Sequence, residues 1–237
     1  MDPEEVLGKL EEEQPHEGIN EARDLLSENL LSDEEYSRLS YGLATGLFKI
    51  GSYHEALEWL ERSTSDRRWM LEGFCWMNLR DPSRARESFL QSAEAMDENR
   101  LESLLLAAQA LAQSGELEEA RRELERLDDR TGPGRVGSEV RFNIGLIHEE
   151  NEDFDQSRKW FRKVLDDGND YFNDEALFHL AVANEELGRL EEAKDYLDQL
   201  EDRVEDDSEL KDALNRARNR LSKDDKRRTE QLRQYDI

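Results

Sequence analysis

One ten-residue frame recurs along the chain and limits what the chain can fold into. Its three clearest copies are GSYHEALEWL (51–60), GELEEARREL (115–124) and GRLEEAKDYL (188–197). Each has glycine first, an apolar residue third, alanine sixth and leucine tenth. Weaker copies begin at residues 17, 80 and 152, so consecutive copies start 29 to 37 residues apart. A period in this range indicates a solenoid of stacked helix pairs.

A second amphipathic stretch precedes each frame, as in LESLLLAAQALAQS (101–114) and DEALFHLAVANEEL (174–187). Apolar residues recur there at helical spacing, and the small residue that opens the frame lets two helices turn tightly. The frame alanines Ala56, Ala120 and Ala193 are predicted to lie where paired helices approach closely. The residues predicted to fill the space between pairs are Leu60, Phe89, Leu124, Phe161 and Leu197.

The stretch before two frames matches the signature W-x2-L-G-x2-Y. Trp69, Gly73 and Trp76 occupy its W, G and Y, and Ile144-Gly145 occupies its L-G, with Arg141 and His148 in place of W and Y. Over residues 3–207 the chain therefore resembles the tetratricopeptide repeat family. The resemblance implies an all-α, right-handed α-solenoid of about six helix pairs plus a C-terminal capping helix. The implied repeats lie near 3–36, 37–65, 66–100, 101–137, 138–173 and 174–207, followed by the capping helix and charged tail at 208–237.

The charge of the chain bounds its partners. It carries 59 acidic and 33 basic residues, a net charge of −26, which opposes nucleic-acid binding and docking on anionic membranes. This acidity, with arginine outnumbering lysine, is also compatible with a halophilic source. The N-terminal MDPEEVLGKLEEE lacks an apolar signal region, and the single cysteine, Cys75, excludes an internal disulfide. We therefore expect a cytoplasmic protein that is a monomer outside any complex.

The sequence carries no recognisable catalytic set. Phosphate-binding glycine loops and nucleophile elbows are missing, and the four histidines fall in separate repeats. The carboxylate-rich DDGND (166–170) is interpreted as a solvated turn, because its glycine comes too early for a calcium loop. Cys75 is interpreted as a small buried hydrophobe. We therefore predict a protein without enzymatic activity, cofactor or metal.

The resemblance implies that the first helix of each pair lines a concave face, through its fifth, ninth and twelfth positions. In the helix predicted around 67–79, Met70, Phe74 and Met77 lie on that face, although the opposite face is also apolar. Either neighbouring helices of the chain cover them or a partner does. The predicted groove residues are Tyr41, Phe48, Met70, Phe74, Met77, Leu105, Gln109, Phe142, Leu146, Phe178 and Val182.

Charged residues near this face give further expectations. An acidic rim of Glu149, Glu150, Glu185 and Glu186 favours a basic or amphipathic protein or peptide ligand. Arg38, Arg67 and Arg68 form a small basic patch, which we interpret as solvated loop residues. KDDKRR (223–228) is interpreted as a solvated helix end, with contact to a partner or to the acidic body as the alternatives.

The leading functional hypothesis is a scaffold that holds a peptide or helix of another protein in the concave groove. The alternative is an assembly, chaperone or regulatory subunit of a larger complex that uses its convex or terminal surfaces.

Overall fold

The computed structural model describes residues 2–28, 30–204 and 209–235, with side chains as far as residue 223. These residues form thirteen α-helices and one short 3-10 helix, and no strand lies among them. The chain divides into two compact units, Met1–Ala120 and Arg121–Ile237. The division falls inside the eighth helix and does not test the predicted repeat boundaries, which stay a proposal.

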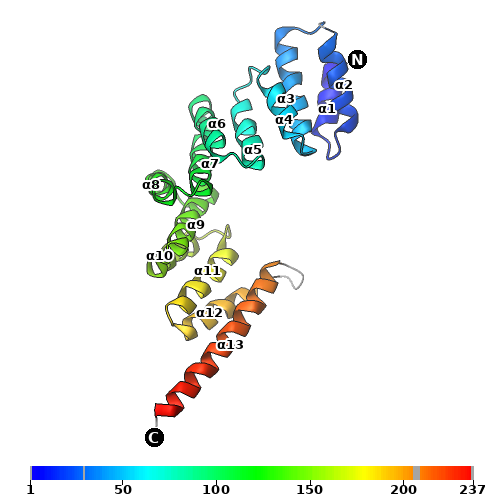
Figure 1. Ribbon diagram of the computed structural model, residues 1–237. Coiled ribbons are helices and arrows are strands. Elements are labelled where there is room, and N and C mark those ends of the chain that lie inside the picture. Colours follow the sequence, from blue (N-terminus) through cyan, green and yellow to red (C-terminus); the bar gives the residue numbers. More distant parts are fainter. Residues whose placement is uncertain (1, 29, 205–208, 236–237) are drawn as a thin grey trace. The chain divides into compact units, whose positions relative to one another are not determined.

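Unit 1 contains helices that pack in sequential pairs (Figure 1). Its helices are α1 (Pro3–Glu11), α2 (His16–Ser27), α3 (Asp33–Lys49), α4 (Tyr53–Leu60), α5 (Arg68–Asn78), α6 (Pro82–Ala95) and α7 (Arg100–Gln113), with the 3-10 helix Asp97–Asn99 before α7. Helix α8 (Leu117–Asp128) begins in unit 1 and ends in unit 2.

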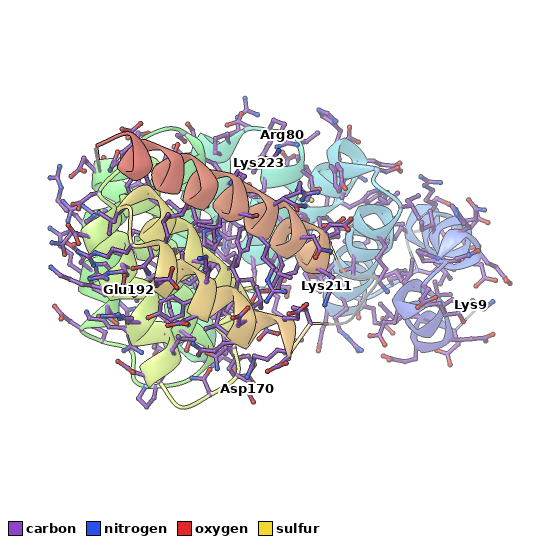
Figure 2. All side chains as sticks on the ribbon, turned by 90° about the horizontal axis from the view of Figure 1, so that it is seen from below. Lys9, Arg80, Asp170, Glu192, Lys211 and Lys223 are labelled. Atoms are coloured by element: carbon purple, nitrogen blue, oxygen red, sulfur yellow. The ribbon has the colours of Figure 1, made fainter. Side chains whose placement is uncertain are left out.

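Unit 2 continues the same pattern with α9 (Arg135–Glu150), α10 (Phe154–Asp166), α11 (Asn173–Glu186) and α12 (Leu190–Glu201), followed by α13 (Glu209–Tyr235). Within this unit α9 packs on α10, α11 packs on α12, and α13 packs on both α11 and α12. The predicted all-α fold of about six helix pairs and a terminal helix is confirmed. Exposed charged residues such as Asp170 and Glu192 lie on the outside of this unit (Figure 2).

One left-handed residue reverses the chain inside most of the helix pairs. Gly51, Gly115 and Gly188 have φ values of 80°, 82° and 70°, which glycine adopts without steric cost. The weaker frames place Arg80 and Glu152 at the same point, with φ values of 62° and 58°. The first position of the frame therefore sets the turn between paired helices, even where it is not glycine.

Close helix packing is centred on glycine–phenylalanine contacts. A Cβ atom at Gly73 of α5 would come within 2.5 Å of the Phe89 ring on α6. At Gly145 of α9 it would come within 2.6 Å of the Phe161 ring on α10. Both phenylalanines are completely buried. Each glycine thus leaves the space that a phenylalanine of the paired helix fills.

Helix α1 is held against α3 by packing and by a lysine. A Cβ at Gly42 would lie 2.5 Å from Cδ2 of Leu7, so the two helices approach closely at this point. From the end of α3, the Nζ of Lys49 donates hydrogen bonds to the carbonyl oxygens of Glu11 (2.5 Å) and Glu12 (3.1 Å). A cation at a helix C-terminus interacts favourably with its unpaired carbonyls. These contacts fix the wall of the hollow described below.

The terminal helix covers the apolar end of unit 2. Leu214, Ala217 and Leu221 of α13 are buried in a cluster with Leu177, Ala181 and Leu197. Arg218 pairs with Asp198 and Glu201 of α12. Helix α13 therefore caps the last helix pair, as the sequence predicts. The structure describes no side chain beyond residue 223, so the charged segment 223–228 lies outside the described side chains except for its first residue.

Arg141 of α9 takes the place of the signature tryptophan and is mostly buried. Its Nε donates to Asp128 at the end of α8 (2.7 Å), and its Nη1 donates to Asp167. Asp167 also accepts a hydrogen bond from Ser138 (2.7 Å). The segment 166–170 is therefore no purely solvated turn, because Asp167 is an internal partner of α9.

Cys75 should resist alkylation in the native protein. Its side chain is fully buried in α5, and burial, with a smaller contribution from Glu72, raises the pKa of its thiol to about 12. Since the thiolate is the reactive form, incubation with iodoacetamide at pH 8 should leave Cys75 unmodified, whereas the urea-unfolded chain should react completely. Intact-protein mass spectrometry measures both. Rapid native labelling would contradict the buried position of this residue.

Candidate functional site

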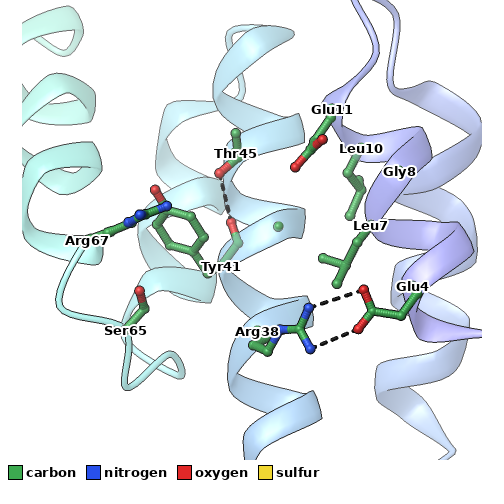
Figure 3. Close-up of a pocket in the computed structure, with 11 residues that line it drawn as sticks. Glu4, Leu7, Gly8, Leu10, Glu11, Arg38, Tyr41, Thr45, Ser65 and Arg67 are labelled. Atoms are coloured by element: carbon green, nitrogen blue, oxygen red, sulfur yellow. Dashed lines mark hydrogen bonds and ion pairs between the residues drawn. The ribbon is translucent and has the colours of Figure 1, made fainter.

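Three adjoining hollows lie on one face of unit 1. The first, of about 580 Å³, lies between α1 and α3 and is lined by Glu4, Leu7, Arg38, Tyr41, Thr45 and Arg67, among others (Figure 3). The second, of about 180 Å³, is lined by Tyr41, Arg67, Met70, Leu71, Phe74, Met96 and Asn99. The third, of about 580 Å³, is lined by Ser65, Asp66, Arg67, Ala95, Met96, Asp97 and Glu98. We call these three hollows the unit-1 groove.

The hollows adjoin because they share lining residues. Tyr41 and Arg67 line both the first and the second, and Met96 and Arg67 line both the second and the third. Arg67, the residue before α5, therefore lines all three. The groove runs from α1 across α3 and α5 to the segment that joins α6 and α7. A cleft of mixed polar and apolar lining on a rigid helical frame is typical of a binding site.

The electrostatics of the groove are set by two arginines and a tyrosine. Arg38 forms a two-fold contact with the carboxylate of Glu4, at 2.8 and 3.2 Å (Figure 3). Burial raises the pKa of the Tyr41 phenol above its ordinary value, against the opposite effect of the nearby Arg67 charge. The phenol is therefore neutral at physiological pH and can donate or accept a hydrogen bond.

The predicted residues of unit 1 divide between groove and core. Tyr41, Met70 and Phe74 are half-buried and line the groove. Phe74 and Met77 also pack against the cluster around Phe89, with the Phe74 and Phe89 ring centroids 5.3 Å apart. The chain thus covers one side of this apolar helix itself. Phe48 and Gln109 are half-buried as well, and Phe48 lies 5.5 Å from the Tyr53 ring.

Leu105 is a correction to the predicted groove. Its side chain is 1% exposed, so it belongs to the core and offers no surface to a ligand. Several residues of α7 close to Leu105 in the sequence are buried as well: Ser103, Ala107, Ala108 and Ala110. The positional rule for a concave face fails here because α7 buries residues around much of its circumference.

In unit 2 the predicted residues take part in aromatic packing. Phe142 stacks on Phe172 with ring centroids 5.4 Å apart, and its edge meets His179 at 5.5 Å. Leu146 packs on the same cluster, and Phe178 packs on the cluster that α13 closes. Val182 is half-buried on α11. Phe142, Leu146 and Phe178 are therefore partly committed to contacts within their own unit.

The predicted acidic rim is partly neutralised. Glu149 contacts Nδ1 of His179 at 3.0 Å, and Glu185 accepts hydrogen bonds from Arg220 of α13 at 2.9 and 3.2 Å. Glu150 and Glu186 remain exposed. Because α13 brings Arg220 to Glu185, the rim offers a basic ligand less negative charge than the sequence alone indicates.

The sequence-based interpretation of the basic patch as solvated loop residues holds for Arg67, which is exposed in the turn before α5, and is corrected at Arg38 and Arg68. Arg38 is paired with Glu4, and Arg67 lines the groove. Arg68 lies over the Trp69 ring at 4.2 Å and donates to the Ser63 carbonyl at 2.6 Å. The only sequence signal for Arg67 was its position just before Met70 and Phe74.

No metal-binding cluster of three or more histidine, cysteine or acidic side chains occurs within the described part of the chain. Across those same residues, no helix combines the length and apolar character needed to cross a bilayer.

The chain was compared with models of protein families, with curated proteins and with solved structures. The family model of the tetratricopeptide repeat matches residues 77–136 and 142–208, more than half of the chain. A search of the curated proteins gave no match.

Solved structures share the fold at low identity. The apo form of RapI matches with a TM-score of 0.74 and 10% identity, covering 92% of this chain and 74% of that one. The apo quorum sensor NprR from B. thuringiensis matches with a TM-score of 0.68 and 16% identity, covering 86% of this chain. This chain spans 63% of the NprR structure. PilF of Pseudomonas aeruginosa has a TM-score of 0.59 and 17% identity, with coverages of 73% and 78%. With helix pairs, turn positions and family match in agreement, the chain belongs to the tetratricopeptide repeat family.

Proposed function

We propose that this protein is a non-enzymatic scaffold that holds a peptide or helix of a partner protein against the first-helix face of unit 1. The observation that carries the proposal is the unit-1 groove itself. Side chains of α1, α3 and α5, together with the segment before α5 and the segment that joins α6 to α7, line three adjoining hollows. Two of these hollows have volumes of about 580 Å³. A fold relative, NprR, has been solved in complex with its cognate peptide NprX, with a TM-score of 0.55 and 15% identity to this chain.

The groove has the chemical character that extended ligands use. Its lining combines the apolar side chains of Leu7, Met70 and Phe74 with the polar groups of Tyr41 and Thr45. Methionine-rich and aromatic surfaces adapt to varied side chains. A single peptide groove of this kind would bury on the order of 1,000–1,600 Å² in total.

Met70→Gln should weaken peptide binding by at least about tenfold, because a near-isosteric polar group replaces an apolar contact in the 180 Å³ hollow. The probe is a 12-residue peptide selected from a random mRNA-displayed library against the wild-type protein. Fluorescence anisotropy of the labelled peptide gives Kd for each variant.

Leu90→Gln is the matched control. Leu90 is half-buried in the same apolar cluster as Met70 but lies on α6, the second helix of its pair. It should change stability without changing affinity. Met70 is a better position than Phe74 for testing the groove, because Phe74 is also in ring contact with the buried Phe89 and its replacement would disturb the core. Equal affinities for wild type and Met70→Gln would refute the groove, as would protection of α4 and α6 amides instead of α3 and α5 on peptide binding.

A further inference from the structure

The three arginines near the groove differ in whether their guanidinium groups already have a partner within the protein. Arg38 is held by the carboxylate of Glu4 through two contacts, and Arg68 is held by a carbonyl and an indole ring. The guanidinium of Arg67 makes no ion pair or side-chain hydrogen bond with any residue that the structure describes. Figure 3 shows it beside the Tyr41 ring, facing the groove, while dashed contacts join Arg38 to Glu4.

An arginine in this position is suited to one kind of ligand group. Guanidinium presents a planar fork of donors that matches a carboxylate, and it keeps its charge at any physiological pH. Arg67 lines all three hollows, so a ligand that enters any of them passes within reach of its donors.

The smallest hollow adjoins this cation and is largely apolar. Met70, Leu71, Phe74 and Met96 line it, and its volume is about 180 Å³. An apolar cavity of about 150 Å³ is large enough to bind benzene. The hollow therefore has room for one leucine, methionine or phenylalanine side chain.

We infer that the partner segment carries a single carboxylate beside a bulky apolar side chain, with the carboxylate bound by Arg67 and the apolar group in the 180 Å³ hollow. This inference rests on the proposed function and specifies its ligand. One carboxylate fits and an acidic run does not, because Asp66, Asp97 and Glu98 line the adjoining hollow and would repel further negative charge. Outside the Arg67 contact, the −26 charge of the protein favours a neutral or basic segment.

The test is a set of three parallel selections from a random 12-residue mRNA-displayed library, against wild type, Arg67→Gln and Arg62→Gln. Wild type should enrich peptides with one aspartate or glutamate within two residues of a large apolar residue. Arg67→Gln should keep the apolar residue and lose the acidic one. Arg62→Gln is the matched control and should keep both, since Arg62 is exposed, lies over the Trp59 ring and lines none of the three hollows.

Affinities of the best wild-type peptide complete the test. Arg67→Gln should bind it about tenfold more weakly, and the peptide with aspartate replaced by asparagine should bind wild type about tenfold more weakly. The two changes together should lose little more than either alone, as expected for partners in one contact. Circular dichroism should show unchanged helicity in Arg67→Gln.

Two results would overturn the inference. One is enrichment of basic or neutral residues beside the apolar anchor, and the other is an Arg67→Gln affinity within twofold of wild type. If peptides are enriched but Met70→Gln leaves their binding unchanged, the groove assignment itself fails, and the ligand specification fails with it. If Met70→Gln weakens binding while Arg67→Gln does not, the groove stands and only the carboxylate contact is wrong.

Discussion

Phe161→Ala should lower the free energy of unfolding of unit 2 by about 3–5 kcal/mol, the range for truncating a buried phenylalanine. The ring is completely buried and fills the space above Gly145, where a single added carbon would already collide. It also lies 5.4 Å from the Phe142 ring and 5.1 Å from His179, both measured between centroids. Glycine has no side chain that could move into the vacancy, so the cavity remains open.

Urea unfolding followed by circular dichroism measures this loss, and hydrogen exchange of α9 and α10 amides measures it locally, because the two units need not unfold together. Tyr171→Ala is the control within the same unit. Tyr171 is 52% exposed, and its removal should cost less than about 0.5 kcal/mol. Similar losses in the two variants would mean that α10 does not pack on α9 as described.

Arg141→Met should destabilise unit 2 by about 3 kcal/mol, because it leaves the mostly buried carboxylate of Asp167 without its cation and leaves Asp128 with only the more distant Lys163, at 3.7 Å. The side chains of Arg141, Asp128 and Asp167 are 13%, 15% and 10% exposed. Burial lowers the pKa of Arg141, but hydrogen bonds and charges from Asp167 and Asp128 outweigh it and raise the pKa above its ordinary value. Methionine preserves much of the side-chain volume, so most of the loss is electrostatic.

A double-mutant cycle with Asp167→Asn isolates the pair. If the contact carries the stability, Arg141→Met should cost much less in the Asp167→Asn background than in wild type. Arg126→Met provides the comparison at an exposed site. Arg126 is 71% exposed and paired with Glu123 in the same helix, so its loss should hardly change the free energy of unfolding. A cost for Arg141→Met no greater than that of Arg126→Met would exclude a structural role for the network.

The repeated frame predicts the core of this protein well because its information is local. Ala56, Ala120 and Ala193 are all fully buried, as are Phe89 and Phe161, where the frame places them. Each of these positions is fixed by helical periodicity and by the turn that precedes it, so a ten-residue pattern is enough to locate it.

The groove is less predictable because its chemistry depends on residues far apart in sequence. Arg38 is neutralised by Glu4 and Glu185 by Arg220, and no periodic pattern encodes either pair. Leu105 follows the spacing of a surface position yet is enclosed by its neighbours. Arg67 belongs to a connecting segment, where the repeat gives no register, and its importance follows only from the three hollows that meet at its side chain.

The left-handed turn residues also bear on how the chain reaches its native state. Each reversal needs one residue in an uncommon backbone region, and three of the five such positions are glycine, which enters that region freely. The loop to be closed within a helix pair is therefore only a few residues long, so its entropic penalty is small. Ordering can start at any of several hairpins and spread to adjacent ones, a nucleation-and-growth process characteristic of repeat arrays.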